Sequence, residues 1–214
     1  MKPYVVKQGD YLTKISHRMG FSAKDVWNHP KNGELKKLRG DGEILCAGDI
    51  LHVPDEPKKR LPLTSETSNR YEARVPRLPV RLVLAIDGEP LAGERYRVEG
   101  IGDDEEKVTD GEGAATFEVD VHIRAVTIVL LDRKTRCRMM VGDLDPVSEP
   151  SGARMRLTNL GFYDPAVAGE DQYEAHDDGA LRAALLAFQR ARSLEPTGEL
   201  DEPTRAELVA QNGA

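Results

Sequence analysis

The chain has 214 residues, of which 39% are hydrophobic, only 5% are aromatic and 31% are charged, and its formal net charge is −7. This balance favours several modest domains over one large core. It also argues against a nucleic-acid partner, because phosphate binding requires a basic face. No apolar run reaches the length of a membrane span, so we expect no membrane insertion.

The first quarter of the chain has the order strand, helix, helix, strand. Residues 4–6 and 50–53 are short, apolar runs rich in β-branched residues, which is typical of strands. Asp10 is predicted to cap the first helix, and Gly20 to end it. Ser22 then opens a capping-box-like start for a second helix. Two strands this short must pair, and the helices must cover one face of the pair.

This stretch resembles a LysM module, a small βααβ unit that binds glycans containing N-acetylglucosamine, such as peptidoglycan. The resemblance is carried by Tyr4, Val6, Gly9, Asp10, Leu12, Ile15, Gly20, Val26, Trp27, Asn28, Gly48, Ile50, Val53 and Pro54. It implies a sugar groove between two loops, formed by Gly9, Asp10, Tyr11 and Leu12 on one side and by Leu45 and Cys46 on the other. Residues 29–43, beside this groove, are longer and more charged than the connector usual in the family.

Two aromatic residues of this module are candidates for stacking on a sugar ring. Tyr11 stands where the family usually has Thr, in the predicted groove loop, and is the stronger candidate. Trp27, on the second helix, is expected to pack in the core instead. The two cysteines, Cys46 and Cys137, lie in different predicted domains, and we expect both to be free thiols.

Residues 56–79 are rich in Pro, Ser, Thr and clustered charge, which predicts an extended linker and independent motion of the first module. Residues 80–142 follow as short strands separated by turn signals, which predicts an antiparallel β-sandwich. The pattern of residues 87–93, followed by residues 109–114 with Phe117, resembles transthyretin-like or carboxypeptidase-regulatory-like domains, which usually act as spacers or interaction surfaces. The acidic loop 103–106 fits a solvated hairpin tip better than a calcium site.

Residues 143–214 have a helical pattern. We predict a short helix over 154–163 that ends at Gly161, a helix over 179–192, and a last helix capped by Asp201. The segment resembles the three-helix peptidoglycan-binding-like domain that is often appended to wall hydrolases. Its motifs are Arg156-Leu157, Leu160-Gly161-Phe162-Tyr163, the run from Ala184 to Gln189, Leu194, Thr197-Gly198, Leu200-Asp201, Thr204 and Leu208. The acidic stretch 166–179 replaces the tight turn usual before the long helix.

The sequence offers no catalytic constellation. The five histidines are scattered, without the spacing of zinc ligands. Cys46 and His52 share a module but have no third group to orient them. No stretch frames the pair of carboxylates that a muramidase requires. We therefore predict no catalytic residues, no metal and no cofactor.

The predicted architecture is multidomain α+β, with a βααβ module (1–55), a linker (56–79), a β-sandwich (80–142) and a three-helix domain (143–214). The leading hypothesis is a non-enzymatic protein that binds peptidoglycan or another N-acetylglucosamine-containing glycan, with two modules adding avidity. The alternative is a protein–protein adaptor. A wall hydrolase ranks last.

The charged connector 29–42 and the segment 144–147 make the chain look like proteins that accompany type VI secretion and other contractile injection machines. That resemblance implies tail or spike proteins as partners. The start of the sequence has no apolar stretch typical of a secretory signal peptide, so the expected location is the cytoplasm, or delivery to the periplasm or export with the apparatus.

Overall fold

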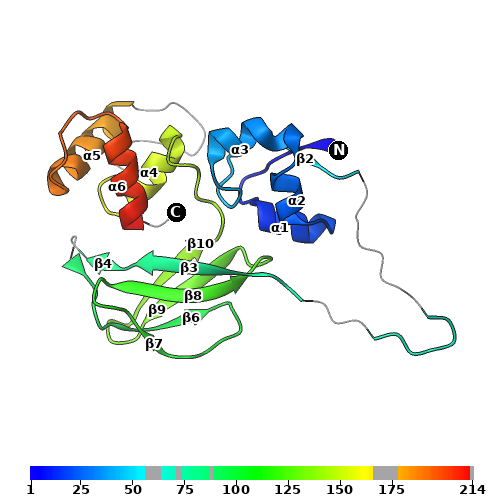
Figure 1. The fold of residues 1–214 in the computed structure, drawn as a ribbon. Coiled ribbons are helices and arrows are strands. Elements are labelled where there is room, and N and C mark those ends of the chain that lie inside the picture. The colour runs from blue at the N-terminus through cyan, green and yellow to red at the C-terminus, as the bar shows by residue number, and fades with distance from the viewer. Residues whose placement is uncertain (56–63, 71–73, 87–88, 166–177, 213–214) are drawn as a thin grey trace.

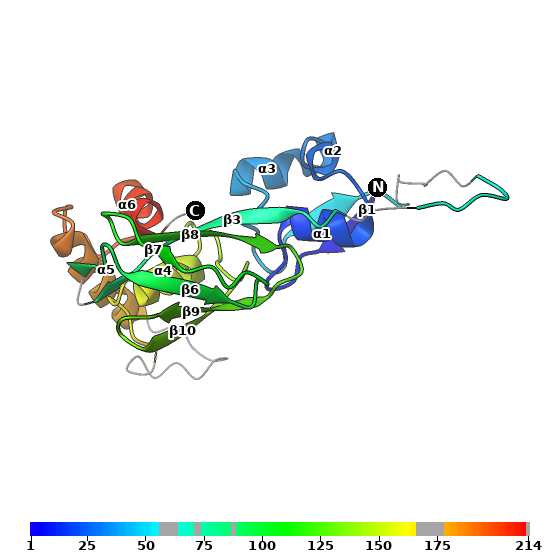
Figure 2. The ribbon, with the colours of Figure 1, turned by 90° about the horizontal axis from the view of Figure 1, so that it is seen from below.

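The computed structural model describes residues 1–55, 64–70, 74–86, 89–165 and 178–212. These residues form an N-terminal module (1–55), a central β domain (74–142) and a C-terminal helical domain (143–212), each with its own apolar core. Figure 1 shows the two helix-containing units side by side on the β3 side of the central domain. The turned view in Figure 2 again places α6 beside β3, and these two elements are in contact.

The N-terminal module is built on two paired strands. Its elements are β1 (Lys2–Val5), α1 (Leu12–Met19), α2 (Ala23–Trp27), the 3-10 turn η1 (Pro30–Asn32), α3 (Gly33–Arg39) and β2 (Ile50–Val53). β1 and β2 are antiparallel, in a register that runs from Lys2 opposite Val53 to Val5 opposite Ile50. The helices cover this pair, and Ile15, Leu51 and Val53 are completely buried between them.

The segment predicted to be a charged connector contains a helix instead. α3 begins after η1 and carries Leu35 into the core, while its lysines remain exposed. With seven residues and few apolar positions, it is too short for the sequence pattern to indicate a helix. The module therefore has one more helix than the predicted βααβ order.

The ends of α1 and α2 are only partly as predicted. Gly20 ends α1 in the left-handed conformation, with φ of 72°, and the Ser22 side chain accepts a hydrogen bond from the Asp25 amide. Asp10, however, is not the cap of α1. The N-cap position of α1 is occupied by Tyr11, whose side chain makes no capping hydrogen bond. Asp10 accepts hydrogen bonds from the Tyr4 hydroxyl and the Lys7 amide instead.

A buried asparagine connects the helical part of this module to its second strand. The Asn32 side chain is fully buried. Its amide nitrogen donates to the carbonyl oxygens of Val26 (2.7 Å) and His52 (2.9 Å), and its oxygen accepts from the His52 amide (2.8 Å). These bonds satisfy polar groups that would otherwise be buried without partners.

The central β domain consists of antiparallel strands in one four-stranded sheet and two strand pairs, which share one core. The strands are β3 (Arg77–Val83), β4 (Ala85–Ile86), β5 (Glu89–Pro90), β6 (Arg95–Glu99), β7 (Lys107–Val108), β8 (Ala114–Asp120), β9 (Ala125–Leu130) and β10 (Thr135–Met140). The larger sheet has the order β10-β9-β6-β7, β3 pairs with β8, and β4 pairs with β5. Tyr96 on β6 joins the layers, because its hydroxyl donates to the Thr116 carbonyl oxygen and accepts from the Thr116 amide on β8.

Two boundaries of this domain differ from the prediction. β3 begins at Arg77, inside the predicted linker 56–79, because its first residues pair with the end of β8, with Arg77 opposite Asp120. The predicted strand 80–86 is interrupted at Leu84, whose amide and carbonyl bond to Gly113 and Leu91 instead. The turn at 87–88 lies outside the described residues.

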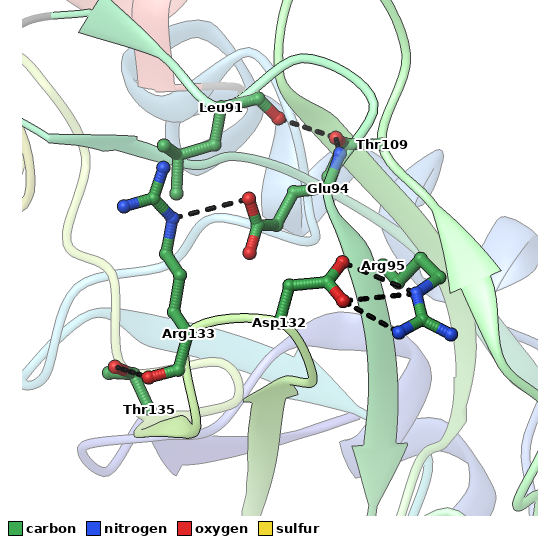
Figure 3. A network of polar contacts seen from close by, with 7 residues as sticks. All are labelled: Leu91, Glu94, Arg95, Thr109, Asp132, Arg133 and Thr135. Carbon is green, nitrogen blue, oxygen red and sulfur yellow. Dashed lines mark hydrogen bonds and ion pairs between the residues drawn. The ribbon is translucent and has the colours of Figure 1, made fainter.

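One end of the larger sheet is held by polar contacts (Figure 3). Arg95 on β6 donates to both carboxylate oxygens of Asp132, and Arg133 donates to Glu94. The buried Thr109 hydroxyl donates to the Leu91 carbonyl oxygen at 2.5 Å. The two ion pairs connect the turn between β9 and β10 to β6 and the residue before it. Because the Arg95–Asp132 pair is exposed, its main effect is positional.

Three helices form the C-terminal domain: α4 (Pro150–Asn159), α5 (Asp178–Ala191) and α6 (Glu202–Asn212). α4 starts four residues before the predicted 154, with Pro150 in its first turn, where the missing amide is not needed. Asp201 caps α6 as predicted, by accepting from the Thr204 amide. Much of the predicted acidic stretch, residues 166–177, lies outside the described part of the chain.

Asn32→Ala tests the internal connection of the N-terminal module. We expect a loss of about 2 to 3 kcal/mol in its free energy of unfolding, because the buried Val26 carbonyl and the partly buried His52 amide and carbonyl lose their partner. Trp27 is the only tryptophan in the chain, so its fluorescence during urea unfolding reports on this module. The exposed Asn28→Ala is the control, with an expected change below about 1 kcal/mol. Equal effects of the two substitutions would contradict this role of Asn32.

Candidate functional site

The loop predicted to carry the sugar groove lies against the central β domain. The Tyr11 side chain is 2% exposed, and its hydroxyl donates to the Val121 carbonyl oxygen at 3.1 Å. Its ring faces Gly142, where a Cβ atom would lie 2.7 Å from the ring carbons. The expectation that Tyr11 presents an open face for stacking is therefore wrong in this arrangement, because the central domain covers the ring.

The remaining predicted groove residues are close together but are also largely buried. Leu12 and Leu45 belong to the module core, and Asp10 is 6% exposed. The Leu12 amide donates to Gly42, so the structure brings the two predicted loops together. Cys46 is half-buried, and burial followed by the charge of Asp145 raises the pKa of its thiol. Glycan binding by these residues stays a prediction.

Gly9 is the last of the predicted groove residues. It lies at a second close approach of the N-terminal module, here to Asp143 at the start of the C-terminal domain. The φ of Gly9 is 76°, and a Cβ atom there would lie 2.5 Å from a carboxylate oxygen of Asp143. The adjacent Gln8 donates to the Asp143 carbonyl oxygen at 2.9 Å and to the Asp145 carboxylate at 3.4 Å. The sequence pattern gave no indication that this loop would meet residues more than 130 positions away.

Arg39 joins the N-terminal module to the C-terminal domain. Its guanidinium donates to both carboxylate oxygens of Asp49, each at 2.9 Å, and to Glu149 at 2.5 Å. Hydrogen bonding to Asp49, and then to Glu149, raises its pKa despite burial. The Arg39 and Asp49 side chains are 6% and 8% exposed, so this pair is more than a solvated surface contact. The units therefore contact one another directly, contrary to the expected independence of the first module.

The C-terminal domain contains two buried polar anchors. Arg156 on α4 is 1% exposed and donates to the carbonyl oxygens of Asp145 and Gly152. Burial lowers the pKa of its guanidinium to about 10. The fully buried Gln189 on α5 donates to Thr197 and Thr204 and accepts from the Gly198 amide, which fixes the turn before α6. Both residues belong to motifs singled out in the sequence, and both have an internal role here.

A groove of about 540 Å³ lies between the N-terminal module and α6. Its walls combine apolar and cationic side chains, among them Leu38, Ile44, Val147, Arg205, Ala206 and Val209. Leu38 on α3 is 62% exposed and contributes apolar surface to this groove. Sequence reasoning missed this groove because α3 was not predicted.

The other features considered as functional sites are the metal-ligating residue types, the acidic loop and the cysteines. Within the ranges that the structure describes, no three His, Cys, Asp or Glu side chains form a group that could hold a metal ion. In the acidic loop, Asp103 accepts from the Glu105 amide and pairs with Lys107, which fits a hairpin tip. Cys46 and Cys137 are both free. None of the described helices combines the length and hydropathy needed to cross a bilayer.

Comparison with known proteins identifies one part of the chain. Residues 151–208 match the family model of the peptidoglycan binding domain. This range covers α4, α5 and most of α6, including the Arg156 and Gln189 anchors and the α6 wall of the groove as far as Ala206. The match suggests peptidoglycan binding in general. No curated protein and no solved structure matched the chain.

The ionisation of Tyr11 tests its burial. Burial, with a smaller contribution from the charge of Glu43, raises the pKa of Tyr11 from about 10 to about 12. The folded state favours the neutral phenol of Tyr11. The stability gained by burying this neutral side chain is therefore fully present below pH 10 and is lost as the pH rises toward 12. We expect a difference titration of phenolate absorbance, wild type minus Tyr11→Phe, to show one midpoint near 12. A midpoint near 10 would mean that the ring is open to solvent.

Gly142→Ala tests the contact itself. The new methyl group would collide with the Tyr11 ring, so we expect the N-terminal module to separate from the central domain and the radius of gyration from solution scattering to increase. Gly102→Ala is the matched control. The φ of Gly102, 75°, is close to the 83° of Gly142, so both substitutions carry a similar backbone cost of about 1 to 2 kcal/mol. They differ in the clash, because open space surrounds Gly102. Unchanged scattering of Gly142→Ala would contradict the close packing.

Proposed function

We propose that this protein binds peptidoglycan without cleaving it, as a modular accessory protein. The observation that supports this most is the match of residues 151–208 to the peptidoglycan binding domain. In this proposal the ligand is the N-acetylglucosamine-containing glycan strand. The C-terminal domain provides the principal contact, and the N-terminal module supports it.

The groove beside α6 is the proposed contact surface. Its volume of about 540 Å³ lies within the range of small-ligand sites and can hold part of a sugar chain. Val147 and Val209 offer apolar surface to the faces of sugar rings. Arg205 offers donors to their hydroxyl groups, and it is held in place by bonds to the Leu200 carbonyl oxygen (2.7 Å) and to Glu202 (2.8 Å).

In this proposal the N-terminal module forms the opposite wall. Leu38 and Ile44 face the groove from α3 and the loop that follows it. Arg39 fixes α3 beside the C-terminal domain through Glu149. The LysM-like unit would then contribute to binding through its α3 side, while the loop at residues 9–12 remains packed on the central domain.

The second candidate function is a protein–protein adaptor of a type VI secretion or other contractile injection apparatus. The burial of Tyr11 favours it, because a loop engaged with the central domain is not available to sugar. In this case tail or spike proteins would be the partners, and the protein would act in the cytoplasm or leave with the apparatus. A purified chain that fails to bind the wall but copurifies with a spike protein would support this candidate.

Sedimentation with insoluble peptidoglycan tests the first proposal. We expect the full-length chain to pellet with the polymer. Ala206→Trp should weaken binding by at least about tenfold, because the indole fills the groove. Ala187→Trp is the control, since Ala187 is also an exposed helical alanine of this domain but lies on α5, away from the groove.

Three results would argue against this assignment. Failure of the wild-type chain to pellet would contradict peptidoglycan binding. Equal binding by the wild type and Ala206→Trp would place the contact elsewhere on the chain. Release of soluble fragments from the polymer during incubation would contradict binding without cleavage.

A further inference from the structure

A second recess lies where the N-terminal module meets the central β domain. It has a volume of about 490 Å³ and is lined by Lys7, Gln8, Asp10, Lys14, His17, Arg18, Val121, His122 and Arg124. Lys7 precedes α1, Lys14 and Arg18 project from it, and Arg124 comes from the central domain just before β9. This basic recess therefore exists only because the two units are docked.

The charge of the basic recess is opposite to that of the whole chain. Four formal positive charges, on Lys7, Lys14, Arg18 and Arg124, face the carboxylates of Asp10 and Asp143, while the net charge of the protein is −7. A cationic hollow between low-dielectric walls concentrates its field on a small anion. It does not need the long basic face that nucleic acid requires.

Most of these cations have no carboxylate partner. Arg18 pairs with Asp10 at 3.4 Å. Among the ion pairs formed by the described residues, none includes Lys7, Lys14 or Arg124.

Lys14 is held in place although it lacks a counter-ion. Its ammonium group donates to the Gly9 carbonyl oxygen and lies 5.4 Å from the centre of the Tyr11 ring. Burial, and then the nearby charge of Arg124, lowers its pKa. An anion in the recess would relieve this repulsion and restore the environment that a lysine ammonium group favours.

We propose that the basic recess binds a carboxylate of the stem peptide that peptidoglycan carries, with Lys7, Lys14 and Arg124 as its donors. This inference rests on the proposed function, because it identifies the anionic part of the same polymer as a second contact. The recess is much larger than an inorganic ion, and a volume of about 490 Å³ suits a short peptide or a sugar–peptide unit. The Arg124 guanidinium can donate two parallel hydrogen bonds to such a carboxylate.

The test uses the full-length chain and a soluble N-acetylmuramyl peptide, with affinity measured by calorimetry. We expect Lys7→Gln combined with Arg124→Gln to weaken binding by at least about tenfold, since two charge-assisted hydrogen bonds are lost. The matched control is Lys24→Gln combined with Arg138→Gln. It removes the same charge from exposed positions of the same two units and should leave the affinity within about twofold.

Two further probes identify the recognised group. The same muramyl peptide with its carboxylates amidated should lose affinity to the same extent, and the Lys7→Gln/Arg124→Gln chain should no longer distinguish the two forms. Inorganic phosphate alone should bind far more weakly than the muramyl peptide. Equal affinity for the amidated peptide, or phosphate binding as tight as that of the muramyl peptide, would overturn the carboxylate assignment.

The outcomes separate this inference from the proposed function. If the chain pellets with insoluble peptidoglycan but the Lys7→Gln/Arg124→Gln variant binds the muramyl peptide like the wild type, the basic recess is not a site and the proposed function stands. If the wild type does not pellet but binds the soluble peptide through these residues, the recess is a carboxylate site and the proposed function fails. Tyr11→Phe should keep its muramyl peptide affinity, since it removes one hydroxyl and leaves the cations in place.

Discussion

Burial of the Tyr11 ring against the central β domain is the contact on which the arrangement of this protein depends. The ring fits only because residue 142 has no side chain, and its hydroxyl is satisfied by the Val121 carbonyl oxygen. The Gly9 loop approaches Asp143 in the same way. Such close approaches exclude water. They also favour one orientation of the module, because closely packed atoms leave no space for small shifts.

Arg39 adds a second constraint, now toward the C-terminal domain. The buried pair with Asp49 holds its guanidinium so that the remaining donors reach Glu149. Removing either carboxylate would leave part of a buried charge without compensation, which is costly. With contacts on both sides, the N-terminal module contributes one wall to the α6 groove and one to the basic recess.

This arrangement bears on how a polymeric ligand would be held. Two weak contacts on one chain bind a polymer more tightly than either does alone, because the second contact forms at a high effective concentration. In the proposed function, the groove would offer apolar surface to sugar rings, and the recess would offer charge to carboxylates. A repeating glycan with anionic peptides presents both kinds of group.

Local sequence patterns predict the strand alternation, the αL glycine after α1, the Ser22 and Asp201 caps, and the motifs of residues 151–208. These depend on neighbours within a few positions, where backbone preferences and periodicity act directly. Three features follow from the folded arrangement instead: α3 is a helix, Asp10 bonds Tyr4 instead of capping α1, and Tyr11 is covered. The Tyr11 ring is covered by residues such as Val121, 110 positions away, and the short helix α3 is stabilised by the core that Leu35 joins. The Asp10–Tyr4 bond spans only six positions, but Tyr4 is placed by the pairing of β1 with the distant strand β2.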